Sequence, residues 1–349
     1  MSGEDSRVFL LDRFGAPEVM RMTHRQTPAP GPGEVLVEVE VSGVNFADTM
    51  IRRGEYLRDQ PLSMAPGSEV VGHVLAAGAE VAVPIGTRVA GWIEAGSAYA
   101  DHVLVPAHRA YPVPEDLPAG AIAAVFLQGT TAEYALHRYG RVKAGETVLV
   151  HAAAGGVGGL AVQLAKIAGA HVIATASSSA KLEVAGAHGA DVMLDSSAPE
   201  TLTARLLEAN EGRGCDVILD GVGGPLFKPS LRALAFGGRY VILGAASQEP
   251  STLDARHLLV RGQTIYGYLL ARLIEEDPDE PARALSHLCG LLRESRLHPR
   301  YELLALERAV EAHHRIEARG LTGKLVLGAA HANRAARANE TPNTSGAAL

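Results

Sequence analysis

Cysteine is scarce in this chain. Only Cys215 and Cys289 occur among its 349 residues, so a framework of disulfides is excluded and a reducing compartment is expected. A structural zinc ion usually needs about four close thiolates, which two cysteines cannot supply. We therefore assign no residue to a metal.

Long hydrophobic runs and an excess of positive charge are missing as well. No run reaches the roughly 18 apolar residues of a membrane-spanning helix. The first residues, MSGEDSRVFLLDRFG, lack the apolar core of a secretory signal. A formal net charge of −7 gives no general attraction to nucleic acid or anionic membranes. We expect a cytoplasmic protein whose partners are small molecules, with neither nucleic acid nor a membrane among them.

The remaining composition is that of a globular protein of two domains, with 47% hydrophobic and 20% charged residues. Residues 33–41, GEVLVEVEV, alternate apolar and acidic side chains and predict a half-buried strand. Short apolar runs separated by Gly and Pro continue to about residue 115, which indicates an antiparallel or barrel-like β region. Residues 118–140 are then typical of a helix.

Beyond Thr147, short apolar runs alternate with segments of helical spacing. Such alternation predicts an α/β fold, with a doubly wound parallel sheet covered by helices on both faces. Helices are expected at 279–295 and 307–319, followed by a strand at 323–328. The strands expected for the parallel sheet are 147–152, 171–176, 191–195, 215–222 and 239–246, with 263–270 as a further candidate.

A glycine-rich turn follows the first of these strands. The segment AAAGGVGG is a variant of G-x-G-x-x-G between a strand and a helix. Glycines there permit tight backbone angles and close approach of a pyrophosphate, which the helix N-terminus attracts. The alternative is a flexible loop of another α/β protein. The residues expected to bind a dinucleotide are Ala154, Gly155, Gly156, Val157 and Gly158.

The second strand of this unit ends without an acidic residue. NAD sites usually carry Asp or Glu about 20 residues after the glycines, on the ribose hydroxyls. Here the strand ends in IATASSSAK, and Ser177, Ser178 and Lys181 offer hydroxyls and an ammonium group. These groups bind a 2′-phosphate, which a carboxylate would repel, so NADPH is the expected cofactor. Alternatively, Lys181 is a solvated lysine of the next helix.

Two later turns end strands of the same sheet. Gly221 and Val222 lie in DGVGG, and Leu243, Gly244 and Ala245 lie in LGAAS. Ligands of open parallel sheets bind beyond the carboxyl ends of the strands. Both turns are therefore expected to border the cofactor, although plain turn glycines would give a similar pattern.

Five segments together resemble a known family: VNFADTMIRRGEY, PGSEVVGHV, HAAAGGVGGLAVQLAKIAGA, DVILDGVGG and GGRYVILGAAS. In this order they are similar to the zinc-free medium-chain dehydrogenase/reductases, and especially to the zeta-crystallin-like NADPH:quinone oxidoreductases. The resemblance covers roughly residues 8 to 328. It implies a GroES-like substrate domain of residues 1–123 plus 267–328, a Rossmann NADPH-binding domain of residues 124–266, and a homodimer. Residues 329–349 lie outside it and are expected to be a disordered tail.

The same resemblance implies further cofactor contacts. Arg319 and Lys324 in EARGLTGK correspond to contacts near the C-terminus, and Ser196 stands where many quinone reductases carry Tyr or His. Gln128 and Thr131 in FLQGTTAEY resemble positions beside the nicotinamide ribose.

The resemblance also bears on a catalytic zinc ion. In zinc alcohol dehydrogenases of the superfamily, a cysteine ligand stands at the position of Asn45. Glu69 and His73 without a thiolate match that site poorly, and His313 and His314 are expected to be solvated.

Without zinc, acceptors that take hydride easily are favoured, namely quinones and α,β-unsaturated carbonyls. Both develop negative charge on oxygen, which a nearby donor stabilises. Asn45 and Tyr56 are the candidate donors and Asp48 the candidate orienting group, unless these side chains only cap a turn. A Tyr at the place of Tyr56 is the proposed proton donor of similar enoyl reductases.

Three functions compete. The first is NADPH-dependent reduction of quinones. The second is NADPH-dependent reduction of an enoyl or enone C=C bond, with a thioester as one possible substrate, because Tyr56 and the SSSAK segment suit it equally. The third is an NADPH-binding protein without catalysis, in a structural, sensory or RNA-binding role, although the acidic net charge gives no basic footprint.

Overall fold

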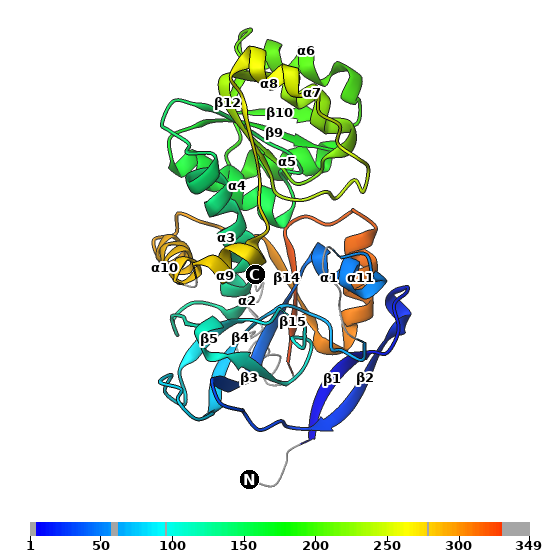
Figure 1. Cartoon of the computed structure of the whole chain (residues 1–349), viewed down its shortest axis with the longest axis vertical. Coiled ribbons are helices and arrows are strands. Elements are labelled where there is room, and N and C mark those ends of the chain that lie inside the picture. The colour runs from blue at the N-terminus through cyan, green and yellow to red at the C-terminus, as the bar shows by residue number, and fades with distance from the viewer. Residues whose placement is uncertain (1–4, 57–61, 95, 278, 330–349) are drawn as a thin grey trace, which may run out of the picture. The chain divides into compact units, whose positions relative to one another are not determined.

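The computed structural model describes residues 5–56, 62–94, 96–277 and 279–329. The chain divides into two compact units (Figure 1). The first comprises Met1–Glu115, Glu302–Arg319 and Leu325–Leu349, and the second comprises Asp116–Tyr301 and Gly320–Lys324. Ala329 is buried and its N–H donates to the carbonyl of Glu40, whereas the expected tail lies outside the described residues from position 330.

The compact units and the domains expected from the resemblance have different boundaries. Residues 116–123 and 267–301 belong to the second unit, although the resemblance placed them in the substrate domain. The packing of α2 (Ala119–Val125) and α10 (Glu280–Arg293) on α3 (Leu127–Glu133) accounts for this. The division into functional domains stays a proposal.

The first unit contains a seven-stranded sheet in the order β14-β15-β3-β4-β5-β7, with β6 paired to β3. The pairs of β3 with β15, β4 and β6 are antiparallel, and β1 and β2 form a separate antiparallel ribbon. The helices α1 (Phe46–Arg53) and α11 (Ala309–Glu317) pack against each other. The strands are β1 (Asp5–Leu11), β2 (Met20–Gln26), β3 (Glu34–Val44), β4 (Glu69–Ala77), β5 (Arg88–Trp92), β6 (His102–Pro106), β7 (Ala110–Pro112), β14 (Tyr301–Ala305) and β15 (Lys324–Gly328).

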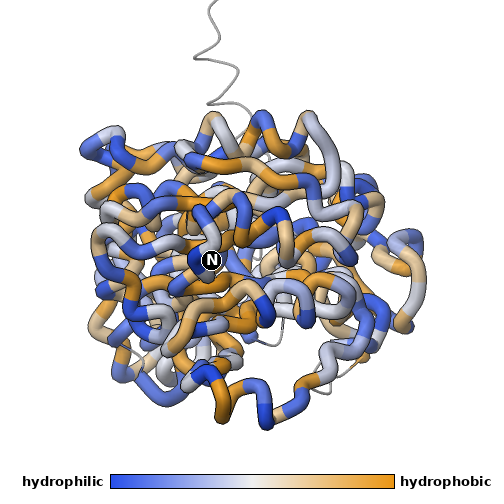
Figure 2. Tube along the Cα trace, turned by 90° about the horizontal axis from the view of Figure 1, so that it is seen from above, coloured by the Kyte–Doolittle hydropathy of each residue, from blue (hydrophilic) through white to orange (hydrophobic). Residues whose placement is uncertain are grey.

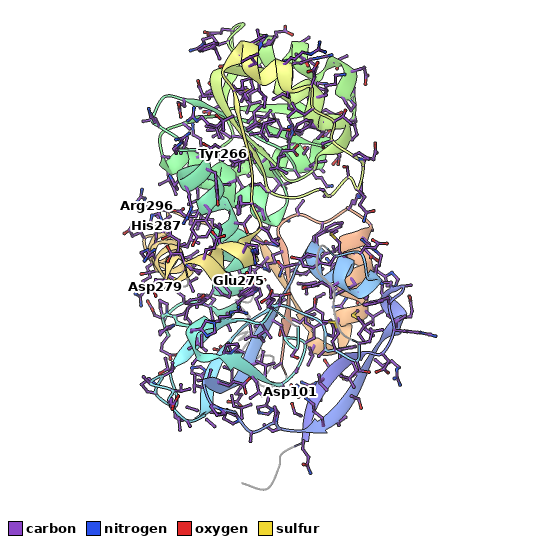
Figure 3. The ribbon with its side chains drawn as sticks, viewed as in Figure 1. Asp101, Tyr266, Glu275, Asp279, His287 and Arg296 are labelled. Carbon is purple, nitrogen blue, oxygen red and sulfur yellow. The ribbon has the colours of Figure 1, made fainter. Side chains whose placement is uncertain are left out.

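The alternating sequence of β3 explains its place at the centre of this sheet. Its valines at 35, 37 and 39 are buried, while Glu38 and Glu40 are half-buried, as expected for a strand with one apolar face. The Arg88 guanidinium binds both carboxylate oxygens of Glu40 at 2.7 and 3.0 Å. Asp101, labelled in Figure 3, accepts in the same two-fold way from Arg7 at 2.8 and 2.7 Å.

The second unit contains a six-stranded sheet in the order β10-β9-β8-β11-β12-β13, in which neighbouring strands are parallel. Numbered within the unit, this is the 3-2-1-4-5-6 order of the doubly wound nucleotide-binding fold, so the expected fold class is confirmed. The strands are β8 (Thr147–Val150), β9 (His171–Ala176), β10 (Val192–Asp195), β11 (Cys215–Asp220), β12 (Leu234–Ile242) and β13 (Thr264–Gly267). Its other helices are α4 (Gly156–Ile167), α5 (Ser179–Ala187), α6 (Pro199–Ala209), α7 (Phe227–Arg232), α8 (Ala255–Arg261) and α9 (Leu270–Glu276).

The core of this unit lies on both faces of its central strands. Three successive residues of β8 (Val148, Leu149, Val150) are buried, which requires cover on either side of the sheet. Leu202 of α6 and Phe227 of α7 belong to one such core cluster. Hydrophobic and hydrophilic residues alternate in short stretches along the Cα trace (Figure 2). In the part of the chain that the structure describes, no helix is long and apolar enough to cross a membrane.

Candidate cofactor and substrate sites

The glycine turn joins β8 to α4 in the second unit. Helix α4 begins at Gly156, with Gly155 as its N-cap in extended conformation. The residue of this turn with left-handed backbone is Ala152, at φ 50°, and none of the four turn glycines has a positive φ. They are needed for space instead. A Cβ at Gly158 would collide with the carbonyl of Ala152, and one at Gly156 would collide with the side chain of Gln128.

The N-terminus of α4 lies in a pocket of about 220 Å³, a volume that includes its opening to solvent. Gly155, Gly156, Gln128, His188 and Arg300 are among the lining residues. The first N–H groups of a helix have no acceptor within it and carry a partial positive charge. Burial and the nearby Arg300 lower the pKa of His188, so this imidazole is neutral at pH 7. The structure thus brings Gln128 to the predicted phosphate turn.

Val157 differs from its glycine neighbours in this turn. It is the second residue of α4 and is half-buried, and it does not line the pocket that Gly155 and Gly156 line. Ala154 and Gly158 do not line this pocket either. What Val157 can offer a phosphate is its backbone N–H, which lies in the first turn of the helix and has no acceptor within it. That Val157 binds the cofactor therefore stays a prediction, and the predicted contact is made by its backbone N–H alone.

The end of β9 gathers the residues predicted to select the cofactor. Lys181 Nζ donates to Ser177 Oγ at 3.4 Å, and Ser178 is the N-cap of α5. The N–H of Ser196 donates to the carbonyl of Ala176 at 2.9 Å, which places Ser196 beside the same strand end.

One acidic neighbour was missed. Asp195 is paired with Ala176 across the sheet, and hydrogen bonds from the N–H and Oγ of Ser197 lower the pKa of its carboxyl. Its signal in the sequence was its place as the last residue of an apolar strand, next to Ser196.

The two later turns are joined to each other by their backbones. The carbonyl of Gly221 accepts from the N–H of Ala246 at 3.0 Å, and that of Val222 accepts from Ser247 at 2.9 Å. Leu243, at the start of the second turn, donates to the carbonyl of Asp220 at 2.8 Å. Gly244 and Ala245 lie between these contacts, so the structure places the predicted Gly221–Val222 and Leu243–Ala245 segments side by side.

A buried carboxylate beneath these turns was not found from the sequence. Asp220 Oδ1 accepts from the N–H groups of Val222 and Gly223, and Tyr240 Oη donates to Asp220 Oδ2 at 2.6 Å. Burial, together with Asp220, raises the pKa of Tyr240 well above its usual value. Tyr240 therefore stays neutral near pH 7 and holds the turn through Asp220.

A buried histidine close to the same turns was also missed. The His151 ring contacts Thr175 Oγ1 at 2.7 Å and Ser230 Oγ at 2.8 Å. Burial lowers the pKa of His151, so its ring is neutral near pH 7 and links the end of β8 to β9 and α7 by hydrogen bonds.

Three further predicted cofactor residues lie outside the strand ends and turns described above. The Thr131 hydroxyl donates to the Leu127 carbonyl within α3, at 2.7 Å. Lys324 is only 1% exposed, and the residue just before it, Gly323, donates to the carbonyl of Ala154 at 2.9 Å. This segment therefore borders the glycine turn. Arg319 belongs to the first unit, where it is exposed after α11 with a φ of 54°.

Two of the predicted substrate residues, Asn45 and Asp48, lie at the start of α1 in the first unit. Asn45 is the N-cap, and its N–H donates to Asp48 Oδ2 at 2.8 Å. The amide nitrogen of Asn45 donates to Glu69 Oε1, also at 2.8 Å. Ser68 Oγ donates to the other carboxylate oxygen of Asp48 at 2.9 Å. Asp48 thus orients the start of the helix, and Glu69 orients the amide of Asn45. Tyr56 is half-buried, just beyond the end of α1.

The expectation for His313 was wrong. Its side chain is completely buried, whereas His314 is exposed and contacts Glu18. Tyr99 Oη lies 3.1 Å from His313 Nε2 and 3.2 Å from Asp48 Oδ2. Arg52 Nε donates to His313 Nδ1 at 3.2 Å. The signal was present in the helical spacing, since residues 309, 312, 313 and 316 share one face of α11.

Two family models match the chain. Residues 31–144 match the alcohol dehydrogenase GroES-like domain, and residues 156–287 match the zinc-binding dehydrogenase family. The chain is 33% identical over 325 residues to a probable quinone oxidoreductase of Schizosaccharomyces pombe, covering 91% of this chain and 95% of that protein. It is 34% identical over 318 residues to a quinone oxidoreductase of Pseudomonas aeruginosa, covering 90% and 97%. This chain belongs to the medium-chain dehydrogenase/reductase superfamily, in its quinone oxidoreductase branch.

Solved structures of this superfamily have the same fold. A mycobacterial protein complexed with NADPH matches with a TM-score of 0.86 at 34% identity, covering 93% of this chain and 99% of the other. The Escherichia coli quinone oxidoreductase complexed with NADPH gives the same TM-score at 30% identity, with the same coverage. The CurF ER cyclopropanase of curacin A biosynthesis matches with a TM-score of 0.85 at 25% identity, covering 93% and 100%. A GroES-like domain and a nucleotide-binding domain are therefore the parts of this medium-chain dehydrogenase/reductase.

The zinc in the family name does not suit these residues. Asn45 presents an amide nitrogen that already donates to Glu69, and an N–H donor is no ligand for a cation. His73 contacts Glu40 at 3.5 Å and Glu115 at 3.3 Å instead of joining Glu69. Across the described residues, no three His, Cys, Asp or Glu side chains gather as metal ligands would. In this member of the superfamily, Asn45 and Glu69 form a hydrogen bond at the place where zinc-dependent relatives bind the metal.

Proposed function

We propose that this chain is an NADPH-dependent oxidoreductase that reduces quinones. The arrangement at the end of β9 carries the proposal, because Lys181 and Ser177 are hydrogen-bonded there and Ser178 stands at the N-cap position of the next helix. A 2′-phosphate is stabilised by such hydroxyl and ammonium donors. The quinone oxidoreductase relatives and the NADPH complexes of structural neighbours support the same conclusion.

The pyrophosphate of the cofactor is assigned to the glycine turn of the second unit. The backbone of residues 154–158 and the N-terminus of α4 fit it, since Gly156 and Gly158 leave no room for side chains. Val157 is assigned the same role through its backbone N–H alone.

The remaining cofactor residues are assigned to the other parts of NADPH. Gln128 and Thr131 are assigned to the nicotinamide ribose, and the joined turns at 221–222 and 243–245 to the nicotinamide. Ser196, Arg319 and Lys324 stay in the proposed set. When bound, NADPH supplies a hydride.

The substrate side is assigned to the start of α1. Asn45 is proposed to donate a hydrogen bond to the acceptor oxygen, on which negative charge develops as hydride arrives. Glu69 holds the amide of Asn45 in one orientation, and Asp48 holds its backbone. Tyr56 is proposed as a second donor, from the residues that follow α1.

The direct test compares acceptors. Chelator-treated enzyme is mixed with NADPH and either a simple ortho-quinone or a short enoyl thioester, and loss of nicotinamide absorbance is followed. Rapid turnover with the quinone and not with the thioester supports the proposal. Failure with both acceptors, while NADPH still binds, contradicts it and favours a non-catalytic NADPH-binding protein.

An enoyl or enone reductase is the second candidate, favoured by the likeness to the CurF ER cyclopropanase and by Tyr56. A C=C reduction needs a proton on carbon, whereas quinone oxygens take protons from water. We expect Tyr56→Phe to lower kcat at least about tenfold for a thioester and less than about threefold for a quinone. Equal loss with both substrates would remove this distinction.

We also propose a homodimer in the cytoplasm. Strand β13 is one of the two edge strands of the parallel sheet, with β10 at the other edge, and Phe236, Leu259 and Val260 near β13 are 83%, 82% and 77% exposed. Exposed apolar side chains beside an open edge favour association with a second copy. Cys215 and Cys289 are buried and form no disulfide, in keeping with a reducing compartment.

A further inference from the structure

A hydrogen-bonded chain of buried side chains connects the start of α1 to α11. It runs from Arg52 through His313 and Tyr99 to Asp48, with distances of 3.2, 3.1 and 3.2 Å. All four residues are at most 1% exposed. The rings of Tyr99 and His313 meet edge to face, with centroids 5.7 Å apart. At its outer end, Arg52 forms an ion pair with Glu317 at the end of α11.

The hydrogen bonds among these four side chains can run in only one direction, with each donor on the side of Arg52 and each acceptor on the side of Asp48. A guanidinium only donates, so Nδ1 of His313 must accept from Arg52. Burial and the positive charge of Arg52 lower the pKa of His313 to about 3, and the neutral ring therefore carries its proton on Nε2. That N–H donates to Tyr99 Oη, and Tyr99 in turn donates to Asp48. Burial, with Asp48 nearby, raises the pKa of Tyr99 well above its usual value, so the phenol keeps its proton.

Asp48 is the residue that joins this series of hydrogen bonds to Asn45, one of the proposed substrate residues. Its Oδ2 accepts from Tyr99 and from the N–H of Asn45, and its Oδ1 accepts from Ser68. The Tyr99 bond therefore acts on the same oxygen that holds Asn45. Loss of the Tyr99 donor would leave that oxygen able to turn toward other donors, and Asn45 would lose its fixed orientation.

We infer that Tyr99 and His313 are positioning residues, which lock the Asp48 carboxylate and through it the backbone of Asn45, the residue whose amide donates to the acceptor oxygen in the proposed function. This inference rests on the proposed function, because Asn45 acts on substrate only in that scheme. Neither residue transfers a proton. Arg52 sets the proton of His313 on Nε2, and α11 is thereby part of the substrate site although it contributes no group to the substrate.

The first test compares two Tyr→Phe variants of the full chain. Tyr99→Phe is expected to lower kcat with quinone about tenfold, the effect of one lost hydrogen bond of about 1.4 kcal/mol, with the Kd for NADPH unchanged. Tyr111→Phe, which changes another buried tyrosine of the first unit, on β7, is expected to change kcat less than about twofold. Equal effects of the two variants would overturn the inference.

A double-mutant cycle separates positioning from general damage. In an Asn45→Ala background, Tyr99→Phe is expected to lower kcat by less than about twofold, because the group it positions is already gone. A full tenfold effect in that background would show that Tyr99 does not act through Asn45 and would overturn the inference.

His313 is tested by rescue. His313→Gln keeps one acceptor and one donor, whereas His313→Leu keeps neither and leaves Arg52 Nε buried without its acceptor. The Gln variant is expected to keep at least about a third of kcat and the Leu variant less than about a tenth. Should the Leu variant not fold, the Gln variant and the Tyr99 cycle still decide, and a Gln variant as slow as Tyr99→Phe would count against the donor role of His313.

Hydrogen exchange gives a readout that does not depend on activity. The N–H of Asn45 is protected by Asp48, so Tyr99→Phe should speed its exchange at least about tenfold while Tyr111→Phe leaves it unchanged. Unchanged exchange in Tyr99→Phe would overturn the inference even in an inactive protein. If the wild-type protein reduces neither acceptor but this exchange responds, the proposed function fails and the positioning of Asn45 stands.

Discussion

Nε2 of His313 lies 3.1 Å from the phenol oxygen of Tyr99, a residue 214 positions earlier in the chain. Both side chains are completely buried, and their hydrogen bond joins α11 to the loop that precedes β6. On folding, His313 loses its contacts with water and gains two hydrogen bonds, one that it accepts from Arg52 and one that it donates to Tyr99. Its protonation therefore depends on whether the chain is folded.

Stability should fall in acid because of His313. Its pKa is about 3 in the folded chain and about 6.5 when unfolded. Between these values the unfolded state binds the extra proton, so the free energy of unfolding rises with pH, by up to about 1.4 kcal/mol per pH unit from this group. His313→Gln should therefore show a shallower pH dependence than wild type between about pH 4.5 and about 6.5, measured by urea unfolding.

The neighbouring histidine is the matched control for this measurement. His314 is exposed and contacts Glu18, so His314→Gln removes no buried imidazole and should change the pH dependence less than His313→Gln does. Parallel curves for wild type and His313→Gln would contradict the assignment of His313 as a buried neutral base.

Cofactor preference should depend on Lys181. If its ammonium binds the 2′-phosphate beside Ser177, Lys181→Ala should lower kcat/KM with NADPH about tenfold or more and leave the value with NADH nearly unchanged. Lys166→Ala is the control, since Lys166 pairs with Asp191 at 2.8 Å, away from the end of β9. A similar loss with both cofactors would place Lys181 outside the 2′-phosphate site.

Two Gly→Ala changes should act in opposite directions. At Gly158 the new Cβ would collide with the backbone of Ala152, so we expect a loss of more than about 1 kcal/mol of stability and weaker NADPH binding. Gly290 in α10 has open space around it, and alanine there should stabilise the helix by about 0.5–1 kcal/mol. Thermal unfolding and NADPH titration check both changes. Tight NADPH binding by Gly158→Ala would refute the proposed role of the turn.

The proposed dimer should depend on the apolar residues beside β13. Leu259→Glu combined with Val260→Glu would place two charges in the contact and should weaken self-association at least about tenfold. Analytical ultracentrifugation measures this. Ile85→Glu is the control, because Ile85 is 69% exposed but lies in the first unit. Unchanged association in the double variant would assign the contact to another surface.

Much of the fold could be predicted from local patterns in the sequence. The alternation in β3 and the apolar runs of β8 and β11 were sufficient to predict strands, because burial on one or two faces is visible within a few residues. The glycine-rich turn between β8 and α4 was equally visible. Which residue of that turn takes the left-handed backbone was not, since Ala152 does so while the glycines provide space.

Polar residues in the core were harder to predict. His313 stood beside His314 in a sequence that allows either to face inward, and only the packing of α11 on α1 decided between them. His151 and Asp220 fell near the ends of expected strands and no role was predicted for their side chains, yet they are buried and bonded to polar side chains of other elements.

By itself, the sequence determined the parallel sheet with its glycine-rich turn and the lack of enough cysteines for a thiolate metal site, because these follow from residue type and short-range spacing. Only the tertiary structure decided that Asp48, Tyr99 and His313 share one hydrogen-bonded chain. A hydrogen bond requires its atoms within about 3 Å. Residues far apart in sequence meet that condition only after the strands and helices between them have packed.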